Sequence, residues 1–221
     1  MQFRSSSKKL LGKKSIGRAL AGLMFAIVAG SSVVAANAET KTAVFAGGCF
    51  WCVESDFETV DGVVSAESGY TGGTSSNPTY KNHMKAQHIE AVKIIYDPAK
   101  VNYETLLNIF WRSVNPTDAG GQFCDRGHSY TTAVFAQDQS QLKIAQASKK
   151  KINEAGIIDR PIITPIREAT PFYPAEGYHQ DYYKKNPLRY AFYRKSCGRN
   201  NAVKALWGSE AYFGIHEHKG S

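Results

Sequence analysis

A short strand that runs into a helix is the feature of this sequence that most constrains its fold. Residues 41–46 have the apolar and aromatic content of a strand, and Gly47 and Gly48 permit a tight turn after it. From Cys49 to Val60 the apolar residues recur at helical spacing. The pattern therefore predicts that Cys49 lies at the N-terminus of a helix, directly after a strand.

The rest of the chain alternates strand and helix patterns without a repeat or a clear linker. Residues 115–129 hold glycines and a proline and are expected to form a long functional loop, and a basic, aromatic and irregular tail is expected from Pro187. One α+β domain spanning 39–221 is the simplest prediction. Strands are expected at 63–70, 89–96, 132–136 and 162–168, and helices at 103–114, 139–154 and 178–185.

Residues 1–38 differ from the remainder and predict a signal peptide. They carry six basic residues and no acid, followed by an apolar stretch that is short for a membrane span. The small residues Ala36 and Ala38 predict cleavage after Ala38, export, and a periplasmic location if the source is a Gram-negative bacterium. No stable membrane insertion is expected after cleavage, although the sequence leaves open a leader retained as an anchor.

Charge argues against a nucleic-acid partner. The chain has 27 basic and 19 acidic residues, and six of the basic residues belong to the leader. The remaining domain is nearly neutral, and the run from Lys149 to Lys151 fits a solvated helix face. We expect a monomer that binds no nucleic acid.

Cysteine spacing points to redox chemistry. Cys49 and Cys52 form a Cys-x-x-Cys, whereas Cys124 and Cys197 stand alone. A helix N-terminus favours the thiolate of Cys49, although a merely packed cysteine is the alternative. A thioredoxin-like oxidoreductase using Cys49 and Cys52 is a competing enzyme. Zinc is disfavoured because a second cysteine pair is missing.

A series of short motifs then follows one order along residues 42–197. Each motif is weak alone, but their joint order and spacing resemble the peptide methionine sulfoxide reductase A (MsrA) family. The motifs are Gly47-Gly48-Cys49-Phe50-Trp51-Cys52-Val53-Glu54, Ser68-Gly69-Tyr70, Asn77-Pro78-Thr79-Tyr80, His88-Ile89-Glu90-Ala91-Val92, Tyr96-Asp97-Pro98, Phe110-Trp111, Asp125-Arg126-Gly127 and Tyr178-His179-Gln180.

The resemblance implies a two-layer α/β domain with a ferredoxin-like plait and no cofactor or metal. It also implies reduction of methionine S-sulfoxide in peptides, proteins and the free amino acid, in the repair of oxidised proteins. Cys49 would be the nucleophile that becomes a sulfenic acid. Phe50 and Trp51 would wall a pocket for the substrate methyl group. The remaining site residues implied are Glu90, Tyr80 and Tyr130 around the sulfoxide oxygen, and Asp125, which would hold a water.

Lowering the thiol pKa does little by itself. A shift from about 8.5 to about 6 raises the thiolate fraction about 30-fold, but the accompanying loss of nucleophilicity leaves a gain of only about twofold. A positioned acid contributes about 10²–10⁴-fold. We therefore expect Glu90 to be buried, with a raised pKa, and to protonate the sulfoxide oxygen.

Recycling requires a second thiol and a thioredoxin-like reductant. Cys52 is the nearer partner along the chain, where family members often carry Gly or Ala. Cys197 lies where the family commonly places its recycling cysteine. The sequence leaves open which of the two resolves the sulfenic acid first, and Cys124 is expected to be a small packed residue.

Overall fold

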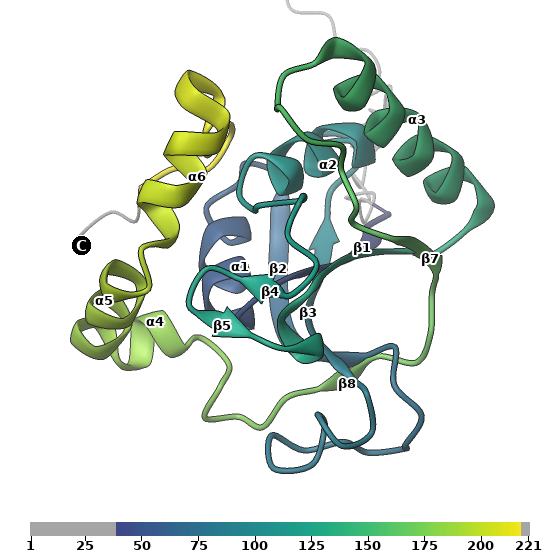
Figure 1. The fold of residues 1–221 in the computed structure, drawn as a ribbon. Coiled ribbons are helices and arrows are strands. Elements are labelled where there is room, and N and C mark those ends of the chain that lie inside the picture. Colours follow the sequence, from purple (N-terminus) through teal and green to yellow (C-terminus); the bar gives the residue numbers. More distant parts are fainter. Residues whose placement is uncertain (1–38, 218–221) are drawn as a thin grey trace, which may run out of the picture. The chain divides into compact units, whose positions relative to one another are not determined.

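The chain is described by a computed structural model that covers residues 39–217. Its main sheet has six strands in the order β7-β6-β1-β3-β2-β8. Figure 1 shows the fold and labels most of these strands. Neighbouring strands are antiparallel, except that β6 and β7 are parallel. The strands are β1 (Lys41–Gly47), β2 (Val63–Thr71), β3 (Ile89–Tyr96), β6 (Thr132–Ala136), β7 (Ile166–Glu168) and β8 (Tyr173–Pro174).

Helices and a small hairpin complete the described part of the chain. The hairpin pairs β4 (Gly121–Gln122) with β5 (Asp125–Arg126), inside the expected long loop. The helices are α1 (Phe50–Phe57), α2 (Tyr103–Trp111), α3 (Gln139–Ala155), α4 (Tyr182–Lys185), α5 (Pro187–Ser196) and α6 (Arg199–Trp207), with 3₁₀ turns η1 (His128–Tyr130) and η2 (Gly208–Glu210).

The elements β1, α1, β2, β3, α2 and β6 form the predicted ferredoxin-like plait. The order of their strands in space is β6-β1-β3-β2. The connection through α1 therefore joins β1 to β2 across β3, and the connection through α2 joins β3 to β6 across β1. Local sequence sets the helix starts, because the side chain of Asn102 accepts the amide of Thr105 at 2.8 Å and that of Asp138 accepts the amide of Gln141 at 2.7 Å. The α+β prediction is confirmed.

Strand alternation divides the core between the two faces of the sheet. Helices α1, α2 and α3 pack on the face that carries Phe45, Val92 and Ile94. The opposite face carries Ile89 and Phe135. Because side chains alternate along a strand, Glu90 shares the face of Val92 and lies under α1. The fold thus brings a carboxyl group from β3 beside the helix that begins after Cys49.

The C-terminal segment differs from the sequence prediction. The tail from Pro187 is not irregular but forms α5 and α6. Pro187 is the first residue of α5, and Gly198, with a φ of +71°, separates the two helices. Trp207 is buried and its indole donates to the carbonyl of Val114 at 2.9 Å. These contacts are distant in sequence, so the local pattern did not reveal them. The strand expected at 162–168 is also shorter, being only β7.

The expected signal peptide, residues 1–38, lies outside the described residues. Within residues 39–217, none of the helices has the length and apolar character required to cross a membrane.

Candidate active site

Cys49 is the N-cap residue of α1, as the sequence predicts. Its carbonyl accepts the amides of Cys52 at 3.1 Å and Val53 at 3.4 Å. The preceding Gly48 has a φ of +86°, and a Cβ there would lie 2.6 Å from Cβ of Gln122. Only glycine fits this turn without strain. The Cys49 thiol is free, and only 6% of the residue is exposed.

Glu90 meets the start of the same helix. Its Oε2 accepts the main-chain N–H of Phe50 at 3.0 Å, and the residue is 2% exposed. Burial raises the pKa of Glu90 to about 8, against the opposing effect of the hydrogen bond from Phe50. The carboxyl group is therefore mostly protonated at neutral pH, as the acid role requires.

The pKa shifts of the two buried thiols, Cys49 and Cys52, run in opposite directions. Burial, followed by a hydrogen bond with Cys52, raises the pKa of Cys49 well above its ordinary value. The bond with Cys49, aided by Arg194 and Arg199, lowers the pKa of Cys52 to about 7 against the effect of its own burial. Burial therefore opposes the Cys49 thiolate that the helix start was expected to favour, whereas Cys49, Arg194 and Arg199 favour a thiolate at Cys52.

The predicted tyrosines Tyr80 and Tyr130 come together although they lie far apart in sequence. Their hydroxyls share a hydrogen bond, and Tyr80 is further held by its amide, which donates to Glu176 Oε1 at 3.0 Å. Burial and then the charge of Glu90 raise the pKa of both tyrosines. Both phenols are therefore protonated hydrogen-bond donors near Glu90 and Cys49.

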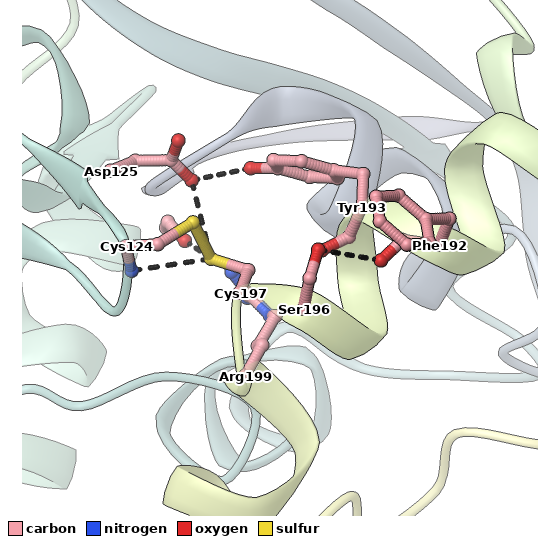
Figure 2. Close-up of a disulfide and its surroundings, with 8 residues drawn as sticks. Cys124, Asp125, Phe192, Tyr193, Ser196, Cys197 and Arg199 are labelled. Atoms are coloured by element: carbon pink, nitrogen blue, oxygen red, sulfur yellow. Dashed lines mark hydrogen bonds between the residues drawn. A yellow bond between two sulfur atoms is a disulfide. The ribbon is translucent and has the colours of Figure 1, made fainter.

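Asp125 faces the site through a residue that the sequence analysis missed. The hydroxyl of Tyr193, on α5, donates to Asp125 Oδ2 and also bonds to the thiol of Cys49 (Figure 2 shows the Asp125 contact). Burial raises the pKa of Asp125. Nothing local distinguishes Tyr193 among twelve tyrosines, because its role depends on the packing of α5.

Phe50 and Trp51 start an aromatic cluster. Trp51 stacks on Tyr182 with ring centroids 3.7 Å apart and donates through its indole to Nδ1 of His179 at 3.1 Å. His179 therefore carries its proton on Nε2, and burial lowers its pKa. Phe50 is 1% exposed, and its ring centroid lies 5.1 Å from that of His179. Trp51 remains partly exposed, and the pocket role of both residues stays a prediction.

Cys124 does not behave as the packed residue that was expected. It is exposed and forms a disulfide with Cys197, the C-cap residue of α5 (Figure 2). Cys197, which the sequence places in the expected irregular tail, instead lies at the end of a helix. The hairpin of β4 and β5 presents Cys124 toward α5, a contact between residues 73 positions apart. Such pairing is not deducible from the spacing of cysteines.

Arg199 is a buried cation behind the site. It is 2% exposed and donates to the carbonyls of Gly47 and Ser113, both at 2.9 Å. Its Nε lies 4.0 Å from Asp56, which also pairs with Arg194 at 2.7 Å. The arginine thus ties α6 to the turn that positions Cys49, a role that the sequence analysis did not identify.

Two groups of three side chains within residues 39–217 have possible metal-ligand atoms within 4.8 Å of one another. The first combines Asp125 with the disulfide cysteines, whose sulfurs are bonded to each other. The second combines Glu54, Glu58 and Asp181, whose carboxylates already engage protein donors. Neither group gives reason to assign a metal.

Sequence comparison decides the family of this chain. The family described as "Peptide methionine sulfoxide reductase" matches residues 41–211. This chain belongs to the peptide methionine sulfoxide reductase family. It is 51% identical over 178 residues to MsrA 2 of Rhizobium meliloti, covering 80% of this chain and 89% of that one. It is 55% identical over 169 residues to MsrA of Ligilactobacillus salivarius, covering 75% and 97%.

Solved structures of the MsrA family have the same fold. Mxr1 of Saccharomyces cerevisiae in reduced form aligns with a TM-score of 0.62 at 28% identity, covering 68% of this chain and 88% of that one. The methionine sulfoxide reductase A of Corynebacterium diphtheriae aligns with a TM-score of 0.60 at 31% identity, covering 67% and 76%.

Proposed function

We propose that this chain reduces the S epimer of methionine sulfoxide in peptides, proteins and the free amino acid, and so repairs oxidised proteins. The observation that carries the proposal is the pairing of a nucleophile with an acid. A buried Cys49 thiol begins α1, and a buried carboxyl of pKa about 8 accepts the first amide of that helix. Membership of the MsrA family supports the assignment.

In the chemical step, the sulfur of Cys49 attacks the sulfoxide sulfur. Cys49 holds the proton of the Cys49–Cys52 hydrogen bond, so the Cys52 thiolate can accept that proton as the attack begins. Glu90 protonates the sulfoxide oxygen, which is otherwise a poor leaving group. The methionine sulfur is reduced, and the oxygen ends on Cys49 as a sulfenic acid.

The tyrosine hydroxyls supply further donors. Tyr80 and Tyr130 lie near Glu90 with raised pKa values, and Tyr193 bonds to Cys49 and Asp125. Protonated phenols can stabilise negative charge on the sulfoxide oxygen as the sulfur–oxygen bond breaks. Phe50 and Trp51 offer an apolar surface for the substrate methyl group.

The sulfenic acid is then removed by a second thiol. Cys52 already bonds to Cys49 and holds the proton that it accepted in the chemical step, so its sulfur attacks the sulfenic sulfur while that proton passes to the departing hydroxyl, which releases water and closes a disulfide. A thioredoxin-like dithiol donor returns the protein to its reduced state by thiol–disulfide exchange. No cofactor or metal enters these steps.

A reductase assay on both epimers of a methionine sulfoxide peptide tests this function. The proposal predicts methionine from the S epimer and none from the R epimer, and Cys49→Ser abolishes the product because a hydroxyl is not a soft nucleophile. Turnover of neither epimer, combined with reduction of an unrelated disulfide through Cys49 and Cys52, would favour the thioredoxin-like alternative instead.

The location of the protein is a separate proposal. The basic and apolar composition of residues 1–38 supports export with cleavage after Ala38, to the periplasm in a Gram-negative source. N-terminal sequencing of the protein from fractionated cells is expected to start at Glu39, whereas an intact leader in the membrane fraction would contradict cleavage. Sedimentation is expected to give a monomer.

A further inference from the structure

We propose that Cys124 and Cys197 form an outer redox pair that takes over the disulfide of the inner pair, Cys49 and Cys52. Cys124 is then the last thiol to react, and the disulfide that the reductant opens is the one between Cys124 and Cys197. This inference rests on the proposed function, because the oxidising equivalents come from methionine sulfoxide.

The redox state of the structure is the one that such a transfer produces. Cys124 and Cys197 are joined by a disulfide, while Cys49 and Cys52 are both free thiols. With the outer pair oxidised and the inner pair reduced, the catalytic thiol is ready for another substrate. In this arrangement, the oxidising equivalents of one substrate would be held outside the active site.

The inner and outer cysteine pairs differ in their exposure to solvent. Cys49 is 6% exposed and Cys52 is 2% exposed, whereas Cys124 is exposed and Cys197 is half-buried. Thiol–disulfide exchange requires the attacking sulfur to reach the disulfide directly. A protein-sized reductant can reach a bridge that includes Cys124 far more readily than one between two buried sulfurs.

Side-chain contacts connect the two pairs. The Tyr193 hydroxyl bonds to Cys49. It also bonds to Asp125 Oδ2, and that oxygen lies 3.9 Å from the sulfur of Cys197; Figure 2 shows these two contacts of Asp125. Cys197 follows Tyr193 by four residues, so the two side chains lie on the same side of α5. Tyr193 and Asp125 therefore connect Cys49 to the sulfur of Cys197 through consecutive side-chain contacts.

Helix α5, which carries Cys197, is only lightly packed. Tyr190 is its only buried residue, and Gly198 directly follows Cys197 with a φ of +71° and no atoms within 4 Å of where its Cβ would lie. Arg194 anchors the middle of the helix through its 2.7 Å ion pair with Asp56. In the proposed exchange, this lightly packed helix end shifts so that Cys197 reaches the inner pair.

The exchange balances without another oxidant. The Cys197 thiolate attacks Cys49 in the inner disulfide and expels Cys52 as a thiolate, which the charges of Arg194 and Arg199 stabilise. Cys124 then attacks Cys197, forming the outer disulfide and releasing Cys49. Two protons pass from the outer thiols to the inner pair. A dithiol reductant finally reduces the outer disulfide and becomes a disulfide itself.

A purely structural disulfide is the competing explanation. It would tie the hairpin of β4 and β5 to α5 across 73 positions, and such a closure stabilises the fold by restricting the unfolded chain. A structural bridge would stay closed throughout the catalytic cycle. A relay bridge must open, and it must re-form at the expense of substrate.

The first test follows the disulfide in the unmodified sequence. Fully reduced protein receives one equivalent of the S-sulfoxide peptide, is quenched with an alkylating agent, and is mapped by mass spectrometry. The relay predicts a Cys124–Cys197 bridge with Cys49 and Cys52 alkylated, whereas a persistent Cys49–Cys52 bridge would overturn it. Absence of methionine would instead refute the proposed function. A sample without substrate, in which all four thiols are alkylated, excludes oxidation by air.

A second test uses Cys124→Ser and the neighbouring control Ser196→Ala. Cys124→Ser is expected to form methionine in its first turnover and to leave the bridge on Cys49. Cycling driven by a thioredoxin-type protein should fall at least about tenfold, because the reductant must then reach a buried sulfur. Ser196→Ala should cycle normally. Undiminished cycling of Cys124→Ser with the protein reductant would overturn the relay.

Discussion

The main-chain N–H of Phe50 donates to Oε2 of Glu90 over 3.0 Å, which fixes the start of α1 to a carboxyl group on β3. Because Cys49 directly precedes Phe50, the same contact holds the acid beside the nucleophilic sulfur. In the ferredoxin-like plait, α1 packs on the face of the sheet that carries the Glu90 side chain. The contact therefore connects the fold to the chemistry.

Replacing the acid tests its role in the chemical step. Glu90→Gln keeps the shape of the side chain but removes the proton donor, so the single-turnover rate should fall by roughly 10²-fold or more. Glu67→Gln on neighbouring β2, a half-buried carboxylate that pairs with Lys93, serves as a control and should keep the normal rate. Rapid quench with methionine detection measures both. A nearly normal rate in Glu90→Gln would assign proton transfer to the tyrosines.

The raised pKa of Glu90 also predicts how stability depends on pH. The pKa is about 8 in the folded protein and about 4.3 in an unfolded chain, so between these values only the folded state keeps the proton. This group's contribution to stability is complete below about pH 4 and is lost as the pH rises toward 8. At about 1.4 kcal/mol per pKa unit, the loss is up to about 5 kcal/mol.

Urea unfolding at pH 5 and pH 8.5 measures this loss. Glu90→Gln has no such titration, so its free energy of unfolding should decline less over this range than that of the unmodified protein. Glu54, whose pKa burial raises to about 7, contributes the same pH dependence to both proteins. Equal declines would contradict the raised pKa of Glu90.

The hydroxyl of Tyr193 should assist ionisation of the catalytic thiol. When its proton turns from Asp125 to the Cys49 sulfur, this hydrogen bond lowers the pKa of Cys49 against the larger effect of burial, so Tyr193→Phe should shift the pH profile of Cys49 alkylation to higher pH. Loss of a hydrogen bond to a charged group should also slow the chemical step by roughly tenfold or more. Tyr183→Phe, whose hydroxyl instead bonds to Glu58, is the matched control. An unmoved alkylation profile would refute this role.

The buried arginine behind the site should be required for stability. Arg199→Met leaves the carbonyls of Gly47 and Ser113 without these donors and removes a cation from beside Asp56, so the free energy of unfolding should fall by about 3–5 kcal/mol. The exposed Lys204→Met on the same helix should change it little. Chemical denaturation of both variants gives the comparison, and similar values would show that the Arg199 contacts contribute no net stability.

The sequence predicts most of the plait because its signals are local. Gly47 and Gly48 break the strand before Cys49, and alternation marks the strand that carries Glu90. The proximity of Glu90, Tyr80 and Tyr130 came from the family resemblance, since nothing in their spacing brings them together. The structure adds the burial that makes Glu90 an acid.

The rest of the site depends on contacts between residues that are distant in sequence. Cys124 meets Cys197 only because the hairpin of β4 and β5 faces α5. Tyr193 reaches Cys49, and Arg199 reaches Gly47, through the packing of helices in a segment whose sequence looks like an irregular tail. The depressed pKa of Cys52 likewise requires the two arginines and Cys49 to be placed around it.

The central claim is that Cys49 takes the oxygen from the substrate. The most direct measurement uses a variant in which Cys52, Cys124 and Cys197 are replaced by serine, so that Cys49 is the only remaining thiol. One addition of the S-sulfoxide peptide should yield one methionine per protein, and mass spectrometry should find one added oxygen on Cys49, as a sulfenic acid that a trapping reagent captures. Formation of methionine without oxidation of Cys49 would contradict the account.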